Sequence, residues 1–441
     1  MLVNLVTPNA PTFMQGINET CREEFAVLFR SEHWKTCFTT EVLNENADLV
    51  LIIAYYRDEV YNDWIKNLLR PNSKCLIGIW GKAVTEARKW LLENVPCIDF
   101  VICGDPEDSL LELSQRFQSG NYSVHSIDGI ATLNDHSFID ASPRKKTFSY
   151  DTFPLPTLSY LSDRNSFPIC VLSSSSGCHG NCSFCEGNIH RNFTNAPTYR
   201  AKSADRVLRE IEYVIAKYNR RVISFSDDNF LVDGKIGKER AEEIAKKITE
   251  RKLNIRFTIE CRADDVDHET FALLHKAGLY KVFIGIESGS QSVLDRYNKG
   301  ITVEQNQLAI NTLHKLGIKC EPGYILFDPA TTLKELHETY SFLSKNTNSL
   351  FAPMQGGGRN QLYFIHNSPL LKFFWPHATS LFYDNVVEEK IPYPYLTYEA
   401  KRLCENYGLV LKTTTQMPNE NMLEYRLRCI KILLNKEGVF I

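Results

Sequence analysis

Three cysteines stand close together in the middle of the chain, at Cys178, Cys182 and Cys185. Three thiolates in one loop can ligate three irons of a [4Fe–4S] cluster and leave the fourth iron without a protein ligand. An open iron suits a chelating small molecule better than simple electron transfer. Gly177 and Gly180 fit a loop that wraps closely around such a cluster. The spacing therefore predicts a cluster that binds and activates a small molecule.

Two plainer interpretations of these cysteines stay open. The loop could hold zinc, with His179 or His190 as a fourth ligand. Usual zinc spacing joins a CxxC pair to a distant second pair, and the sequence shows no such second pair. Chance clustering of buried thiols is the other alternative, because the chain has 13 cysteines and most are scattered singly. The spacing favours the cluster over zinc, and zinc over chance.

The elements around the loop form a βα series. Residues 168–358 alternate apolar runs with amphipathic stretches. Strands are expected at 169–173, 222–226, 255–261, 281–286, 319–327 and 350–354. Helices are expected at 204–218, 238–251, 267–277, 303–316 and 332–345. Such units predict most of a (β/α)6 barrel, whose active site lies at the carboxyl ends of the strands, where the cysteine loop stands.

The loop and the series together resemble a known family. CxxxCxxC with an aromatic residue before the last cysteine, here Phe184, is the signature of the radical S-adenosylmethionine (SAM) superfamily. The resemblance runs from about 168 to 345 and extends more loosely to a cobalamin-binding-type domain in front. It implies a [4Fe–4S] cluster on Cys178, Cys182 and Cys185, with SAM at the open iron. It also implies reductive cleavage of SAM to a 5′-deoxyadenosyl radical.

The resemblance assigns SAM contacts to several strand ends. Asp228 and Asn229 match the place that meets the SAM amino group, although these residue types also favour a capped turn. Arg262 matches the arginine that pairs with the SAM carboxylate, a task for a bidentate guanidinium. A surface salt bridge is the plainer role for that arginine.

Two later segments complete the implied SAM site. Glu287 and Ser288, within residues 285–289, match the segment near the ribose and the methionine moiety. Ile325 lies in a segment similar to GxIxG, which packs against adenine. Phe327 replaces the final glycine of that motif, which weakens the expected adenine contact.

Residues 1–120 predict a separate α/β domain. Strands are expected at 2–6, 47–55, 74–80 and 98–103. Helices are expected at 17–30, 58–69, 83–93 and 107–117. This alternation indicates a Rossmann-like, doubly wound parallel sheet covered on both faces.

The first domain departs from the cobalamin-binding pattern that it resembles. The DxHxxG motif of an axial histidine is absent, and Trp80-Gly81 replaces the usual Gly-Gly. Tyr55 and Tyr56 are also bulky at this edge of the sheet. The balance favours a domain that has lost cobalamin, and cobalamin binding stays open as the alternative.

The bulk properties limit the setting. With 441 residues the chain needs several cores. We expect the first domain at 1–120, a linker at 121–167, the barrel at 168–358 and a mostly helical C-terminal extension at 359–441. The net charge of −3 gives no nucleic-acid footprint, and no signal peptide or bilayer-spanning stretch is evident. We expect a cytoplasmic enzyme with a small-molecule substrate, no membrane partner, and, as the resemblance implies, a reductant such as flavodoxin or ferredoxin.

Two reactions follow from the resemblance, and no catalytic residue beyond the cofactor contacts is assigned. The first is hydrogen abstraction from a natural-product or sugar-like molecule, followed by dehydration, rearrangement or a similar step without cobalamin. The alternative is cobalamin-dependent methyl transfer to carbon. The bulky residues at the first domain's edge favour the first reaction. A zinc-stabilised binding protein is the alternative of another class.

Overall fold

The computed structural model describes residues 2–6, 35–39, 46–53, 68–144, 149–152, 155, 158, 169–185, 199–232, 234–350, 398–417 and 420–440. They belong to two compact units. The first holds the described residues up to 178 and those of 185–226, and the second holds 179–184 and those from 227 onward.

The first unit contains a seven-stranded sheet in the order β2-β1-β3-β4-β5-β6-β7. Its strands are β1 (Leu2–Val6), β2 (Lys35–Thr39), β3 (Leu49–Ile53), β4 (Leu76–Trp80), β5 (Phe100–Ile102), β6 (Ile130–Asn134) and β7 (Ser137–Ile139). The pairings from β2 to β5 are parallel. The last two pairings are antiparallel.

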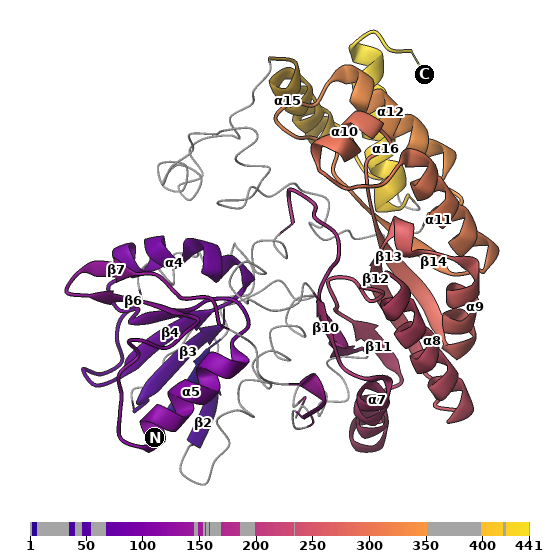
Figure 1. Cartoon of the computed structure of the whole chain (residues 1–441). Coiled ribbons are helices and arrows are strands. Elements are labelled where there is room, and N and C mark those ends of the chain that lie inside the picture. The colour runs from indigo at the N-terminus through magenta and orange to yellow at the C-terminus, as the bar shows by residue number, and fades with distance from the viewer. Residues whose placement is uncertain are drawn as a thin grey trace. The chain divides into compact units, whose positions relative to one another are not determined.

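Both faces of this sheet are apolar and covered. Alternate strand positions point to opposite faces, so Ile77 and Ile79 join the core beneath α4 (Lys82–Asn94), whereas Trp80 joins the core beneath α5 (Glu107–Gln118). Figure 1 shows these helices in indigo and violet beside the strands. The Rossmann-like, doubly wound domain expected from the sequence is confirmed.

Two features of this domain were not predicted. Strand β2 was not expected at all. The expected linker at 121–167 is wrong in part, because β6 and β7 within it extend the sheet as a hairpin. Asp135 and His136 have φ values of 46° and 62° at its turn. Positive φ at both central residues matches the right-handed twist of a two-residue hairpin. The prolines of the following stretch had suggested irregular structure throughout.

The first unit also contains the beginning of the second βα series. Strand β8 (Cys170–Leu172) pairs in parallel with β11 (Val222–Phe225). An unpredicted antiparallel pair, β9 (Ser175–Gly177) with β10 (Tyr199–Ala201), stands between them in the chain. Helix α7 (Ala204–Tyr218) begins at Ser203, whose side chain accepts a hydrogen bond from the Arg206 N–H. The predicted N-cap is confirmed.

The second unit continues the series with three parallel strands, β12 (Arg256–Arg262), β13 (Leu279–Glu287) and β14 (Lys319–Tyr324). The accompanying helices are α8 (Gly234–Glu250), α9 (His268–Ala277), α10 (Gln291–Arg296), α11 (Val303–Lys315) and α12 (Leu333–Lys345). Figure 1 shows α8, α9 and α11 along the strands. Gly278 and Gly317, with φ of 117° and 72°, follow α9 and α11 as predicted. Of the expected sixth strand only Leu350 is described, bridged to Cys320.

The described part of the C-terminal extension is helical, as expected. It consists of α15 (Tyr398–Thr413) and α16 (Met422–Lys436), which pack on each other, and α16 also packs on α12. The Phe327 ring lies 5.1 Å from the Tyr407 ring of α15. None of the described helices is long and apolar enough to cross a bilayer.

Candidate functional site around Cys182

Cys182 lies buried in the second unit, next to the end of β12. The Arg262 guanidinium donates from Nη1 to the Cys182 Sγ over 3.4 Å. A β-carbon at Gly180 would lie only 2.5 Å from the same Nη1. The glycine predicted to suit a tight loop therefore makes room for an arginine against the thiol. Cys178 and Cys185 belong to the first unit, so the grouping of three thiols around one cluster stays a prediction from spacing.

The remaining donors of Arg262 bind protein groups. Nε and Nη2 donate to the two Asp264 carboxylate oxygens over 2.9 and 3.0 Å. Nη2 also donates to the Lys299 carbonyl over 2.7 Å. The bidentate edge expected for the SAM carboxylate is thus occupied by Asp264. The role of Arg262 as a SAM contact stays a prediction. The alternative was a surface salt bridge, and the structure shows a salt bridge with Asp264 in which Arg262 is buried.

A second buried cation belongs to Lys299, the residue whose carbonyl accepts from Arg262. The Lys299 ammonium is buried and donates to Glu287 Oε1 over 2.8 Å. Burial alone would lower the pKa of Lys299, but the Glu287 carboxylate and the Cys182 sulfur raise it above the ordinary value. Lysine at this position therefore stays charged. A β-carbon at Gly285 would lie 2.7 Å from both Lys299 Nζ and Glu287 Oε1, so this glycine also makes room for an ion pair.

Glu287 adopts an unusual backbone conformation where β13 ends. Its φ is +60°, and the Ser288 N–H donates to the Ile286 carbonyl across it over 2.8 Å. The Ile325 N–H donates to the Glu287 carbonyl, also over 2.8 Å. A non-glycine residue in the left-handed region costs free energy and tends to occur at functional sites. This turn brings two residues predicted to contact SAM, Glu287 and Ile325, into direct contact.

Asn229 has the turn-forming role that the sequence left open as the alternative to a SAM contact. Asn229 is fully buried, its amide donates to Asp265 over 2.7 Å, and its Oδ1 accepts from the Leu231 N–H. Asn229 therefore shapes the turn after β11. Asp228 is exposed beside it. A contact between either residue and SAM stays a prediction.

The zinc alternative can be compared with the surroundings of His179. The His179 ring hydrogen-bonds through Nδ1 to the Val232 carbonyl over 2.7 Å. Ligand atoms of His179, Asp264 and Asp265 lie within 4.8 Å of one another. Both Asp264 carboxylate oxygens already accept hydrogen bonds from Arg262, so Asp264 is engaged in an ion pair with Arg262. His190 lies outside the described residues.

The cysteine loop is fixed to a segment that sequence reasoning missed, residues 296–299. The Ser183 N–H donates to the Tyr297 carbonyl over 2.8 Å. The Phe184 ring meets the Tyr297 ring edge-on at 5.4 Å. The Asn298 amide donates to the Asn181 carbonyl, although the two residues are 117 positions apart. Only the Asn-Lys-Gly composition of 298–300 could have indicated a turn there.

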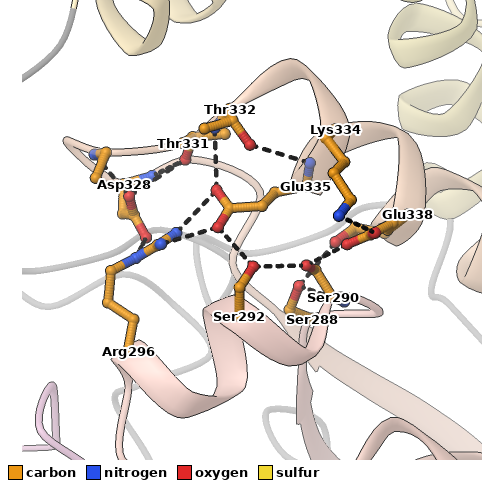
Figure 2. Close-up of polar contacts among 12 residues, drawn as sticks. Ser288, Ser290, Ser292, Arg296, Asp328, Thr331, Thr332, Lys334, Glu335 and Glu338 are labelled. Carbon is orange, nitrogen blue, oxygen red and sulfur yellow. Dashed lines mark hydrogen bonds and ion pairs between the residues drawn. The ribbon is translucent and has the colours of Figure 1, made fainter.

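A buried polar network holds residues 296–299 in place through Arg296. Ser288 is buried, and its hydroxyl bonds Thr339 over 2.7 Å. Figure 2 shows the adjoining part of the network, in which Arg296 binds Asp328 and Glu335. These bonds join the turn after β13 to α10 and α12. Ser288 thus has a positioning role, and its contact with SAM stays a prediction.

Trp80 in the first unit is a core residue. It packs with Leu51, Phe100 and Leu110 on the α5 face, and its indole N–H donates to the Gly104 carbonyl over 2.8 Å. The ring therefore fills space at the carboxyl end of β4, as expected if bulky residues at this edge of the sheet take the place of cobalamin. Tyr55 and Tyr56 lie outside the described residues.

Comparison with known proteins identifies the second βα series. Residues 172–343 match the radical SAM superfamily. The chain is 25% identical over 363 residues to an uncharacterized methyltransferase of Pyrococcus horikoshii, and the match covers 77% of each chain.

Two solved structures share the fold. OxsB, a cobalamin-dependent SAM radical enzyme, matches with a TM-score of 0.62 at 19% identity, over 99% of this chain and 61% of its own. TsrM of Kitasatospora setae, a radical SAM methyltransferase, matches with a TM-score of 0.61 at 16% identity, over 78% and 71%. This chain thus spans less than two thirds of OxsB. Both proteins have been solved with cobalamin bound.

The family match and the cysteine loop both indicate a radical SAM domain, and the sheet of the first unit is the domain expected in front of it. They favour an enzyme over a zinc-stabilised binding protein. The chain therefore contains a radical SAM domain at residues 172–343, and its N-terminal domain has the fold of a cobalamin-binding domain.

Proposed function

We propose that this protein is a cobalamin-dependent radical SAM enzyme that transfers a methyl group to a carbon atom of a small organic molecule. The relative from Pyrococcus horikoshii and the fold neighbour TsrM are both named methyltransferases, which supports this reaction over the dehydration or rearrangement expected first. When bound, the cluster, SAM and cobalamin supply the radical and the methyl carrier.

The observation that carries the proposal is the buried thiol of Cys182, which accepts a hydrogen bond from the buried Arg262 guanidinium. Arg262 donates to its sulfur over 3.4 Å, and hydrogen bonds to ligating sulfurs are a common feature of iron–sulfur sites. Cys178 and Cys185 would complete the three ligands, as their spacing predicts. Asp264 binds Arg262 and Glu287 binds Lys299, so each cation has a carboxylate partner, and the three thiols form the donor set that suits an iron–sulfur cluster.

A second candidate function is hydrogen abstraction without cobalamin, and Trp80 favours it. The ring fills the space at the end of β4 where the family pattern places Gly-Gly. A cobalamin nucleotide tail would have to pass this side chain. The described residues omit 7–34 and 54–67, the segments that follow β1 and β3 in the chain. The two candidates therefore need a direct binding experiment.

The experiment starts with anaerobic reconstitution of the full chain with iron and sulfide, followed by incubation with hydroxocobalamin and desalting. We expect retained cobalamin absorbance and, with dithionite and SAM, S-adenosylhomocysteine that forms only when cobalamin is present. Cys182→Ala should lose iron but keep cobalamin, because Cys182 lies in the other unit. Release of all cobalamin on desalting, with 5′-deoxyadenosine as the only nucleoside product, would replace methyl transfer by the second candidate.

A further inference from the structure

The surroundings of Cys182 contain two ion pairs, and in both the carboxylate is the more exposed partner. The side chains of Arg262 and Asp264 are 8% and 23% exposed. Those of Lys299 and Glu287 are 5% and 12% exposed. In each pair the cation is the more deeply buried partner, and water screens the carboxylate more than the cation. The four charges sum to zero, and the Arg262 guanidinium contacts the thiol directly.

The two cations are linked into one arrangement. Arg262 donates from Nη1 to the sulfur and from Nη2 to the Lys299 carbonyl. The segment that carries Lys299 also lies along the cysteine loop, because the Ser183 N–H donates to the Tyr297 carbonyl and the Asn298 amide donates to the Asn181 carbonyl. Gly180 and Gly285 provide the space, since a β-carbon at either position would collide with these charged groups. A role in packing alone would not require charge at this depth.

We propose that Lys299 raises the reduction potential of the [4Fe–4S] cluster that Cys182 would help to hold, and that Glu287 opposes this effect. The inference rests on the proposed function, because it presupposes the cluster. Reduction adds one negative charge to the cluster, and a nearby fixed cation stabilises the reduced state relative to the oxidised state. A nearby anion does the reverse. Lys299 thus acts indirectly: its positive charge, near the cluster ligand Cys182, changes the reduction potential of the cluster.

The test is a potentiometric titration of the reconstituted full chain, without SAM or cobalamin, followed by electron paramagnetic resonance of the reduced cluster. Lys299→Met should shift the one-electron reduction equilibrium at least tenfold towards the oxidised form, which lowers the midpoint by about 59 mV or more. Glu287→Gln should shift the midpoint in the opposite direction. Lys299→Arg keeps the charge and should restore the wild-type value. A purely structural role would not give shifts of opposite sign.

A matched control comes from the same sheet. Lys281 and Glu321 form an ion pair of 2.6 Å between β13 and β14, with side chains 28% and 18% exposed. Lys281 stands near the start of β13, whereas Glu287 ends it. Lys281→Met should therefore leave the midpoint unchanged. An equal shift in this control would overturn the inference, because the effect would then not be local to Cys182.

The remaining outcomes separate the inference from the proposed function. Wild-type protein that assembles no cluster refutes the proposed function itself. Clusters that assemble normally and have the same midpoint in wild type, Lys299→Met and Glu287→Gln refute the inference alone. If Lys299→Met fails to hold iron, Glu287→Gln decides, since an unchanged or lowered midpoint in that variant refutes the inference.

Discussion

Gly180→Ala is the sharpest test of the contact between Arg262 and Cys182. The added β-carbon would lie 2.5 Å from Arg262 Nη1, whereas real β-carbon contacts essentially never fall below 3.0 Å. The guanidinium must therefore withdraw by about half an ångström. It is held by Asp264 and by the Lys299 carbonyl, so it cannot move without lengthening its 3.4 Å contact with the sulfur or straining those bonds.

The magnitude follows from what is lost. A hydrogen bond that involves a charged group contributes about 1.5–3 kcal/mol, so we expect Gly180→Ala to lower the free energy of unfolding of the second unit by about that amount. Gly180 is not among the residues with positive φ, so backbone strain adds nothing. The urea midpoint of the apo protein, followed by circular dichroism, measures the loss, and iron content after reconstitution should fall with it.

Gly408→Ala is the matched control for this substitution. Gly408 lies within α15, and no heavy atom stands within 4 Å of an added β-carbon. Alanine is favoured over glycine in a helix by about 1 kcal/mol, so this variant should be slightly stabilised. If Gly180→Ala unfolds at the wild-type urea concentration and binds iron normally, the argument that Gly180 makes room for Arg262 is refuted.

Two further perturbations test the supporting structure. Burial raises the pKa of Glu335, but its bonds with Arg296 and other donors outweigh this, so the folded pKa lies below the ordinary 4.5. This stabilisation is present above the unfolded pKa and is lost as pH falls through the lower folded pKa. The urea midpoint should therefore fall more between pH 7 and pH 3 in wild type than in Glu335→Gln, and equal falls would contradict the assignment. Trp80→Phe removes the donor to the Gly104 carbonyl and should destabilise the first unit by about 1–3 kcal/mol. An unchanged thermal midpoint would show that this carbonyl finds another partner.

Local patterns in the sequence were sufficient for most of the elements. The βα alternation predicted all three strands of the second unit's described sheet to within two or three residues, because strand and helix periods depend on neighbours in the chain. Ser203, Gly278 and Gly317 were predicted at helix ends for the same reason. The elements that were missed, such as β2 and the β9–β10 pair, are five and three residues long and depend on distant pairing partners.

The outcome for the candidate site differs from residue to residue. Gly180 was predicted to suit a close approach, and the structure shows which atom approaches it. For Asn229 the sequence left open a SAM contact and a turn-forming role, and its buried hydrogen bond with Asp265 favours the turn-forming role. Lys299 was not predicted at all, because a single lysine before a glycine has the composition of an ordinary surface turn.

The sequence by itself determined the superfamily, since CxxxCxxC and the strand-end residues depend only on spacing and residue type. Only the tertiary structure showed which charges meet the thiol of Cys182. Residues 181–184 and 296–299 lie more than a hundred positions apart and are joined by backbone and amide hydrogen bonds. Such contacts form only when β12 and β13 pair and bring their carboxyl ends to one edge, so no local pattern encodes them.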